Sequence, residues 1–242
     1  VHENPVRKYF IHKIALAVML KYSDKALFVS EYLFNSYFME SGRKVLVTNA
    51  LDPAFTSIAR PWKPKFGEPF NIVMISSLKR FKGIDIFYNL SLKLTKYNFH
   101  LVLNADKSEI EDYFKFREVP ENLRMSSATR DLDPVYRMAH LVVNLSLPEF
   151  CIESFGLTIL EALAYGVPVI VPPFGGICEL VEDGINGYKV DPMDIRALEE
   201  KISWIFSDRD KYSLFSSNAK LIAGKFSYSV MINSIEAVLN EL

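Results

Sequence analysis

From residue 70 onward, short apolar runs alternate with longer segments in which apolar residues recur at helical spacing. The apolar runs predict strands at 70–76, 99–104, 122–126, 140–145, 167–172 and 187–191. The helical spacing predicts helices at 84–95, 107–117, 133–139, 156–165 and 177–182, and then at 194–206, 209–224 and 227–240. Strands that alternate with helices at short spacing indicate βαβ units. We therefore expect an α/β fold, a Rossmann-like parallel sheet with helices on both faces.

The first 50 residues repeat this pattern in a shorter form. Helical spacing covers 7–22 and 31–41, and apolar runs at 26–30 and 45–48 predict two strands. Two strands and two helices are too few to build an independent α/β core. We therefore interpret residues 1–50 as the truncated end of a second, partial Rossmann-like domain.

A change of composition separates these two regions. Residues 51–68 contain Pro53, Pro61, Pro64 and Gly67 among charged residues and show no sustained period. This composition is typical of a linker. The regular pattern then extends from 69 to 225, which we assign to one domain, and we expect residues 226–242 to form a closing helix.

The composition limits the classes of partner. The chain has 242 residues, with 28 basic and 29 acidic side chains and a formal net charge of −1. It has no basic tail or stripe, so we expect no binding to a nucleic-acid polymer. Cys151 and Cys178 cannot build a disulfide framework, and neither lies at metal-ligand spacing with a second cysteine or histidine. A reducing compartment is the simpler interpretation.

Glycine is scarce but clustered. Six of the ten glycines fall between residues 156 and 187. Glycine permits positive φ angles and a close approach of the main chain to a ligand. The cluster therefore indicates either plain strand-to-helix turns or a binding surface.

The loop after the strand at 70–76 carries three cations, Lys79, Arg80 and Lys82, just before a predicted helix. Cations beside a helix N-terminus suit an anion such as a diphosphate. A solvated basic turn is the alternative.

The segment 148–162 gives the strongest chemical signal. Glu153 precedes a helix, and Glu161 lies within that helix among apolar residues, where an ionised carboxylate needs partners such as sugar or ribose hydroxyls. Gly156 allows the helix start to approach a ligand, and the free N–H groups of the first turn favour negative charge. The alternative is a capping box formed by Thr158 and Glu161, which leaves Glu153 and Gly156 unexplained.

Two features of the sequence could indicate a metal site, and both signals are weak. Asp131 and Asp133 are spaced like the paired aspartates of some metal-dependent sugar transferases, but Asp133 followed by a proline is better interpreted as a helix N-cap. Three of the four histidines have no carboxylate or cysteine nearby in the sequence, and His2 alone lies at the end of a predicted strand. We therefore predict no metal site.

The segment from Glu153 to Glu161 is similar to the Glu-x7-Glu motif of the family 4 retaining glycosyltransferases, which have the GT-B fold. Further motifs follow in the family's order and spacing: Gly-x-Pro-Val-Ile at 166–170, Gly-Gly-x-x-Glu at 175–179 and Asp-Gly-x-Asn-Gly at 183–187. Segments 22–30 and 47–53 resemble the last elements of the family's N-terminal domain. The resemblance covers essentially the whole chain.

This resemblance implies a domain arrangement. Residues 69–225 would form the nucleotide-sugar-binding C-terminal domain, and residues 1–50 would be the end of the N-terminal acceptor domain. Residues 51–68 would be the interdomain linker. The helix at 226–242 would cross back toward the N-terminal domain.

The resemblance also implies roles for single residues. Glu153 would contact the transferred sugar, and Glu161 would hold the ribose hydroxyls. The first turn of the helix between them would meet the sugar and the diphosphate through four consecutive residues, Phe155, Gly156, Leu157 and Thr158. His2 resembles the strand-end histidine that faces the reaction centre, so the expected catalytic residues are Glu153 and His2.

The expected cationic contacts depart from the family at one position. Lys82 matches the family's lysine before a glycine, but Ser77 stands where an arginine is usual. The resemblance therefore leaves that diphosphate contact to Lys79 or Arg80, and we take Lys79 and Lys82 as the donor-binding cations.

The function implied is that of a glycosyltransferase of polysaccharide biosynthesis. It would move a sugar from a UDP- or GDP-sugar to a hydroxyl of a glycan or lipid-linked acceptor, with retention at the anomeric carbon and without a metal or other cofactor. The resemblance also implies a cytoplasmic location, with the full enzyme associated peripherally with the inner face of the membrane. A nucleotide-sugar-binding module without independent activity is the alternative, and a GT-B epimerase is a weaker one.

Overall fold

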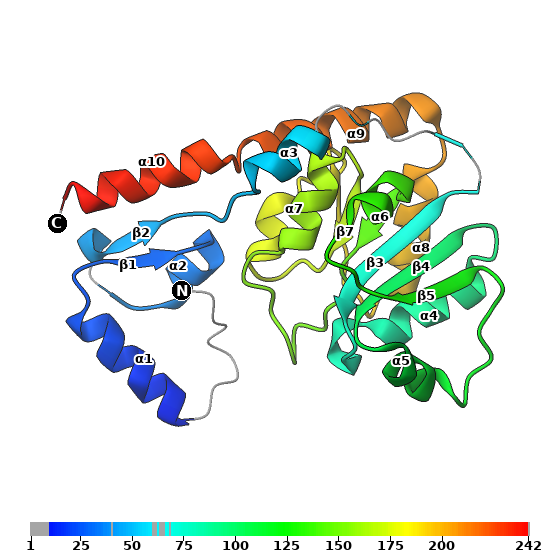
Figure 1. The fold of residues 1–242 in the computed structure, drawn as a ribbon, viewed down its shortest axis with the longest axis horizontal. Helices are drawn as coiled ribbons and strands as arrows, with labels where there is room; N and C mark the ends of the chain where they lie inside the picture. The colour runs from blue at the N-terminus through cyan, green and yellow to red at the C-terminus, as the bar shows by residue number, and fades with distance from the viewer. Residues whose placement is uncertain (1–9, 40, 60–61, 63–65, 68, 242) are drawn as a thin grey trace.

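The computed structural model describes residues 10–39, 41–59, 62, 66–67 and 69–241. Its main body is a six-stranded, all-parallel sheet with the strand order β5-β4-β3-β6-β7-β8 (Figure 1). The strands are β3 (Asn71–Ser77), β4 (Asn98–Asn104), β5 (Leu123–Ser127), β6 (Leu141–Val143), β7 (Val169–Val171) and β8 (Gly187–Lys189). The order runs outward in both directions from β3 and β6, so the topology reverses between these two strands. Ligands bind at such a reversal in open α/β sheets.

Helices cover both faces of this sheet. The helices are α4 (Ile84–Lys93), α5 (Lys107–Phe114), α6 (Asp133–Met138), α7 (Leu157–Ala164), α8 (Ile195–Ile205) and α9 (Arg209–Gly224). Alternate residues of β3 point to opposite faces, as the pleat requires: Ile72 and Met74 join a buried cluster with α4, α5 and α8, and Val73 joins a second one with α6 and α7. The expected Rossmann-like α/β fold is confirmed.

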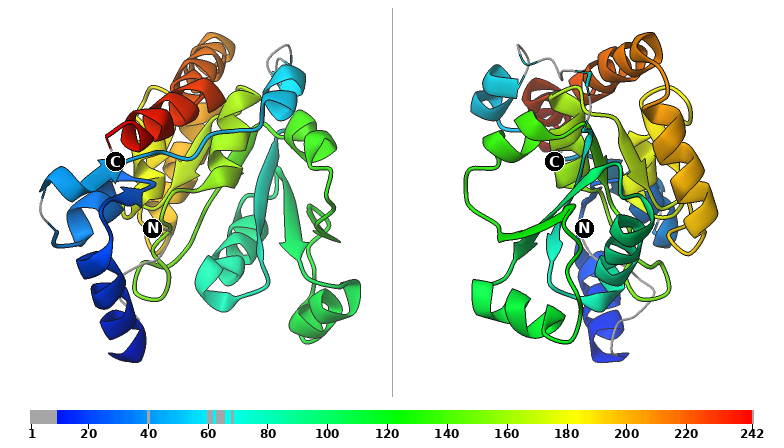
Figure 2. Two further views of the ribbon diagram at one scale, coloured as in Figure 1. Left: turned by 60° about the vertical axis from the view of Figure 1, so that its left-hand side comes forward. Right: turned by 90° about the vertical axis from the view of Figure 1, so that its right-hand side faces the viewer.

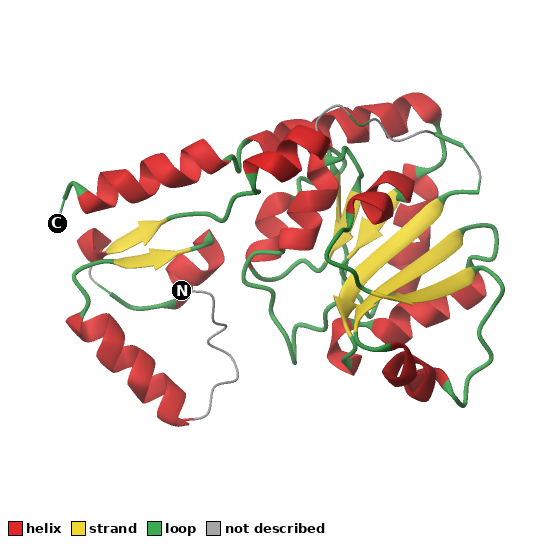
Figure 3. Ribbon diagram, in the orientation of Figure 1, coloured by secondary structure: helices red, strands yellow, loops and turns green. Residues whose placement is uncertain are grey.

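The N-terminal residues form a smaller layer beside this body. It contains α1 (Phe10–Tyr22), β1 (Ala26–Phe28), α2 (Glu31–Ser36), the 3-10 turn η2 (Ser41–Arg43) and β2 (Lys44–Leu46). β1 and β2 pair in parallel as a sheet of their own, separate from the six-stranded one (Figure 3). Helix α1 extends away from the large sheet, as the turned view in Figure 2 also shows.

The last helix connects the large domain with the N-terminal layer. Helix α10 (Tyr228–Leu239) runs from the end of α9 toward β1 and β2 (Figure 1). Just after it, the Glu241 carboxylate accepts a hydrogen bond from the Lys25 ammonium at 2.8 Å. No helix in the described part of the chain is both long enough and apolar enough to cross a membrane.

The predicted linker contains a helix that its composition did not indicate. Helix α3 spans Pro53–Ala59, seven residues. The Asp52 carboxylate accepts the Ala54 N–H at 2.6 Å, and Pro53 occupies the first helical position, where its missing N–H costs nothing. Phe55 then packs edge to face on the ring of Tyr165, with 5.6 Å between centroids. Packing of one aromatic side chain, Phe55, therefore stabilises a short helix whose sequence shows no apolar periodicity.

Two further local predictions need correction. The helix expected at 177–182 is a 3-10 helix, η4 (Gly176–Leu180), which begins after Gly175 at φ 85°. Asp133 is not the N-cap of α6, because Leu132 holds that position and Asp133 is the first helical residue. The Asp133 N–H instead donates to the Asp131 carboxylate at 3.0 Å.

The N-terminal layer and the large domain meet at η4. Both carboxylate oxygens of Glu179 accept main-chain N–H groups at the start of α2, from Glu31 at 3.0 Å and from Tyr32 at 2.7 Å. Beside this contact, a Cβ added to Gly176 would lie 2.0 Å from the Ser154 carbonyl oxygen and 2.6 Å from Ser30 Cβ. The Gly176 main chain therefore packs against the Ser154 backbone and the Ser30 side chain at a distance that only glycine allows.

We expect Gly176→Ala to lower the free energy of unfolding by about 1–3 kcal/mol, because the added methyl group overpacks this junction. Urea denaturation measures the change. Gly224→Ala is the matched control, since an added Cβ there meets nothing within 4 Å. It should leave stability unchanged or raise it by up to about 1 kcal/mol. Equal stability of the two variants would show that the close approach at Gly176 is absent.

Candidate functional site

A cavity of about 370 Å³ lies at the carboxyl ends of β3 and β6, where the strand order reverses. Residues from the ends of both strands and from the start of α7 line it, together with Asn49, which follows β2. The full lining is Asn49, Ile75, Ser76, Ser77, Lys82, Asn144, Glu153, Ser154, Phe155, Gly156, Leu157 and Thr158. Six predicted site residues therefore share one cavity: Lys82, Glu153, Phe155, Gly156, Leu157 and Thr158.

An ion pair between Lys82 and Glu153 forms one side of this cavity. The pair is mostly shielded from solvent, with 18% of the Lys82 side chain and 23% of the Glu153 side chain exposed. The Glu153 carboxylate also accepts hydrogen bonds from Ser146 Oγ at 3.1 Å and from Asn144 Nδ2 at 3.5 Å. Lys82 Nζ donates in addition to Cys151 Sγ at 3.3 Å. Both charges thus have further partners in the segment that follows β6.

The same contacts set the charge of Lys82. Burial acts to lower the pKa of its ammonium, but attraction to Glu153, the hydrogen bond to Glu153 and the proximity of Cys151 outweigh it, so the pKa is raised. Lys82 is therefore protonated at neutral pH, and the cavity contains a fixed cation.

Gly83 determines where Lys82 points. The 3-10 turn η3 (Arg80–Lys82) ends at Gly83 with φ 82°, and a Cβ on Gly83 would lie 2.2 Å from the Leu145 carbonyl oxygen. The turn can therefore pack directly on the loop after β6, where Leu147 N donates to the Phe81 carbonyl at 2.8 Å. This close packing places Lys82 beside the segment that carries Glu153.

The other two cations of this loop lie elsewhere. Lys79 and Arg80 are exposed, and neither lines the cavity. The Lys79 ammonium lies 5.7 Å from the centroid of the Phe81 ring. The structure thus does not bring Lys79 to the other donor-binding candidates, and Ser77 lines the cavity in the position where a cation was expected. A diphosphate contact by Lys79 stays a prediction.

The N-terminus of α7 forms the opposite side of the cavity. Gly156 is the N-cap with φ 97°, and a Cβ there would lie 2.6 Å from Ile177. Its carbonyl accepts Ile159 N and Leu160 N, both at 3.1 Å, whereas no group in the described chain accepts the N–H of Leu157 or Thr158. These two donors and the helix dipole favour a bound anion.

Phe155 anchors the segment before this helix. Its side chain is buried and packs edge to face on Phe226, with 5.6 Å between the ring centroids. The main chain, rather than the Phe155 side chain, is therefore the part of this residue that is available to a ligand.

Glu161 lies one turn further along α7, just beyond the cavity lining. Thr158, three residues earlier on the same helix face, does line the cavity. The Glu161 carboxylate accepts a hydrogen bond from the Tyr136 hydroxyl, and Gly156 rather than Thr158 is the N-cap. The capping-box interpretation is therefore wrong. Burial raises the pKa of Glu161, and the hydrogen bond from Tyr136 opposes this rise.

His2 lies outside the described residues, so its expected role stays a prediction. Among the residues that the structure does describe, no group of three or more histidine, cysteine, aspartate and glutamate side chains is arranged to hold a metal ion.

Sequence reasoning missed several residues of the site. Asn144 and Ser146 directly follow the predicted strand at 140–145, and polar residues after a parallel strand are a signal that could have identified both. Asn49 and Tyr136 gave no signal, because the first reaches the cavity from another layer and the second acts from beneath α7.

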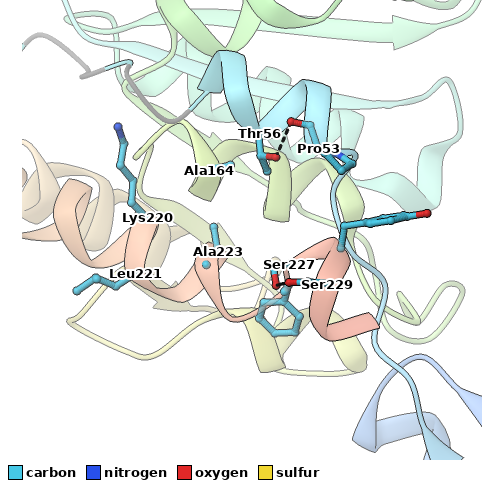
Figure 4. Close-up of a pocket in the computed structure, with 11 residues that line it drawn as sticks. Pro53, Thr56, Ala164, Lys220, Leu221, Ala223, Ser227 and Ser229 are labelled. Atoms are coloured by element: carbon cyan, nitrogen blue, oxygen red, sulfur yellow. Dashed lines mark hydrogen bonds between the residues drawn. The ribbon is translucent and has the colours of Figure 1, made fainter. Parts of the chain in front are cut away.

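A second cavity, of about 410 Å³, lies between α3, the end of α7 and the junction of α9 and α10 (Figure 4). Pro53, Ala223 and Phe226 contribute to its largely apolar wall, and the Thr56 hydroxyl is occupied by a hydrogen bond to the Pro53 carbonyl at 2.9 Å. None of the predicted site residues lines this cavity.

Residues 57–222 match the family of glycosyl transferases group 1, and the chain belongs to this family. The poly(glycerol-phosphate) alpha-glucosyltransferase of Bacillus subtilis is 25% identical over 236 residues, which cover 90% of this chain and 33% of that protein. The chain thus spans about a third of the length of that relative.

Solved structures of GT-B glycosyltransferases share the fold. Sucrose-phosphate synthase from Thermosynechococcus elongatus superposes with a TM-score of 0.81 at 18% identity, over 100% of this chain and 64% of that one. Anabaena Alr3699/HepE, solved in complex with UDP and glucose, superposes with a TM-score of 0.78 at 21% identity, over 95% of this chain and 66% of that one.

The Lys82–Glu153 pair can be tested without an activity assay. A double-mutant cycle of Lys82→Met and Glu153→Gln, measured by urea denaturation, should give a coupling energy of about 1–2 kcal/mol, above the usual value for surface pairs. The exposed pair Arg196–Glu200, with 3.0 Å between its charged atoms, is the control and should give about 0.3–0.5 kcal/mol. A coupling for Lys82–Glu153 no larger than the control value would contradict the geometry.

Proposed function

We propose that this chain binds a nucleotide diphosphate sugar in the cavity between β3, β6 and α7 and transfers the sugar, with retention, to an acceptor hydroxyl. Membership of the glycosyltransferase family supports sugar transfer as the general activity. The observation that carries the finer proposal is that a cation, a carboxylate and two unpaired main-chain N–H groups face one cavity.

The diphosphate is proposed to lie between Lys82 and the start of α7. The Lys82 ammonium and the N–H groups of Leu157 and Thr158 are among the donors of the residues that line the cavity. A fixed cation and a helix N-terminus stabilise the charge that develops on a departing phosphate. Because these groups supply positive charge of that kind, we propose that transfer needs no metal ion.

The transferred sugar is proposed to lie against Glu153. Ser146 and Asn144 hold one carboxylate oxygen of Glu153, and this leaves the group fixed in orientation. We assign Glu153 to positioning and polarising the sugar rather than to attacking it. The bond from the anomeric carbon to the phosphate oxygen breaks, the bond to the acceptor oxygen forms on the same face, and the acceptor proton passes to the departing phosphate.

The ribose and base of the donor, and the acceptor, remain to be assigned. Glu161 is proposed to hold the ribose hydroxyls, and UDP is a reasonable first nucleotide because the Anabaena structure contains it. For the acceptor we propose a glycan or a lipid-linked polyol, in line with the poly(glycerol-phosphate) relative. Peripheral association with the inner face of the membrane stays a prediction.

Glu153→Gln should lower sugar transfer or donor hydrolysis by about 100-fold or more, because the charge that polarises the sugar is lost. Release of UDP or GDP from their sugars measures the rate, and isothermal titration with UDP and GDP should show nucleotide binding within about threefold of the wild type. The assays contain EDTA, and a requirement for added Mg²⁺ would contradict the metal-free proposal.

Glu149→Gln is the matched control, since Glu149 is exposed in the same loop and does not line the cavity. It should leave turnover unchanged. Turnover by Glu153→Gln equal to that of this control would overturn the role of Glu153. Nucleotide binding without any turnover by the wild-type chain would favour the binding-module alternative, and no binding of either nucleotide would refute the proposal.

A further inference from the structure

Tyr136 of α6 is packed beneath α7, where its hydroxyl contacts Glu161. Its side chain is completely buried, and its ring stacks on that of Tyr165 with centroids 5.4 Å apart and planes 22° apart. Phe55 of α3 packs edge to face against the Tyr136 ring at 6.2 Å. Aromatic contacts on two sides hold the ring in this orientation and so place its hydroxyl.

That direction is toward the Glu161 carboxylate. The Tyr136 hydroxyl donates to Glu161 Oε2, and its distance to the Thr158 carbonyl oxygen is 3.4 Å. Within the described chain, Glu161 Oε1 accepts no hydrogen bond. One oxygen of the carboxylate is thus fixed from inside the protein, and no donor in the described chain occupies the other.

We propose that Tyr136 is a positioning residue for the donor nucleotide: it orients Glu161 so that the free carboxylate oxygen receives ribose hydroxyls. This inference rests on the proposed function, because it assigns the ribose to Glu161. Tyr136 itself does not touch the ligand in this account, since it is buried behind the helix.

The stacked neighbour Tyr165 provides an internal comparison. Its hydroxyl donates to Asp133, whose carboxylate also receives two hydrogen bonds from Arg137 Nε at 2.8 and 2.7 Å. The two tyrosines therefore share one buried stack but direct their hydroxyls to different carboxylates. Of the two, only the Tyr136 hydroxyl contacts Glu161, the carboxylate assigned to the ribose.

The hydrogen bond also favours the ionised form of Glu161. Burial raises the pKa of Glu161, and the Tyr136 hydroxyl lowers it. The other titratable groups of this cluster are Tyr165, Asp133 and Arg137, which are bonded to one another through Asp133, and Asp131, whose charge acts on Tyr165. Removal of the Tyr136 hydroxyl should therefore raise the pKa of Glu161 further. On acidification, Glu161 should then become protonated at a higher pH than in the wild type.

The test compares Tyr136→Phe with Tyr165→Phe and Glu161→Gln in the 242-residue chain. Isothermal titration with UDP and GDP from acidic to neutral pH measures affinity, and urea denaturation measures stability. Tyr136→Phe should weaken nucleotide binding about 10-fold, the value of one hydrogen bond to a charged group. It should also move the acidic fall in affinity to higher pH. Tyr165→Phe should leave both within about twofold of the wild type.

The outcomes separate the two proposals. Equal affinity and an equal pH profile for the two tyrosine variants would overturn the role of Tyr136, even if Glu161→Gln weakens binding. Unchanged binding by Glu161→Gln would overturn the assignment of the ribose to Glu161 and this inference with it. A wild-type chain that binds neither nucleotide would refute the proposed function itself.

Discussion

The ion pair between Lys82 and Glu153 joins two loops that leave neighbouring strands of the sheet at the point where the strand order reverses. A mostly shielded pair gives up hydration, and it is tolerated where further hydrogen bonds complete its surroundings. Ser146, Asn144 and Cys151 supply them here. The pair therefore does more than link the loops, since it holds a cation and a carboxylate in one cavity with a defined separation and orientation.

Close backbone packing makes that arrangement possible. Gly83 allows the turn that carries Lys82 to rest on the loop after β6, and Gly176 N donates to the Glu153 carbonyl at 2.9 Å. The same Gly176 junction touches Ser30 of the N-terminal layer, where Glu179 binds the start of α2. Glu153 is thus positioned by a main-chain hydrogen bond to a junction whose contacts extend into the N-terminal layer.

Periodicity predicted the parts of the fold that depend on repeated burial. All six strands of the large sheet and the helices on its faces follow from apolar spacing, because each element needs an apolar side toward one core. Helix α3 escaped prediction because its stability comes from Asp52, Pro53 and the packing of one side chain, Phe55, on the rings of Tyr136 and Tyr165. The prediction that Asp133 is an N-cap was wrong because its carboxylate accepts hydrogen bonds from Arg137 and Tyr165 instead. Tyr165 is distant in the sequence, so a local pattern could not indicate this contact.

The residues of the candidate site also fall into those that the sequence could predict and those that it could not. The segment 153–161 could be recognised because its carboxylates and glycine stand out in an apolar sequence, and the structure places most of it around one cavity. The choice among three cations in 79–82 depended on the direction of a 3-10 turn, which a sequence pattern does not specify. Tyr136 could not be found, since only tertiary packing brings α6 beneath α7.

The most direct measurement is a crystal structure of the chain with a bound nucleoside diphosphate, UDP first and GDP second. The account predicts the diphosphate within hydrogen-bonding distance of Lys82 Nζ and of the N–H groups of Leu157 and Thr158, with the ribose hydroxyls on Glu161. A nucleotide bound elsewhere, for example in the cavity between α3 and α10, with Lys82 and α7 untouched, would contradict it.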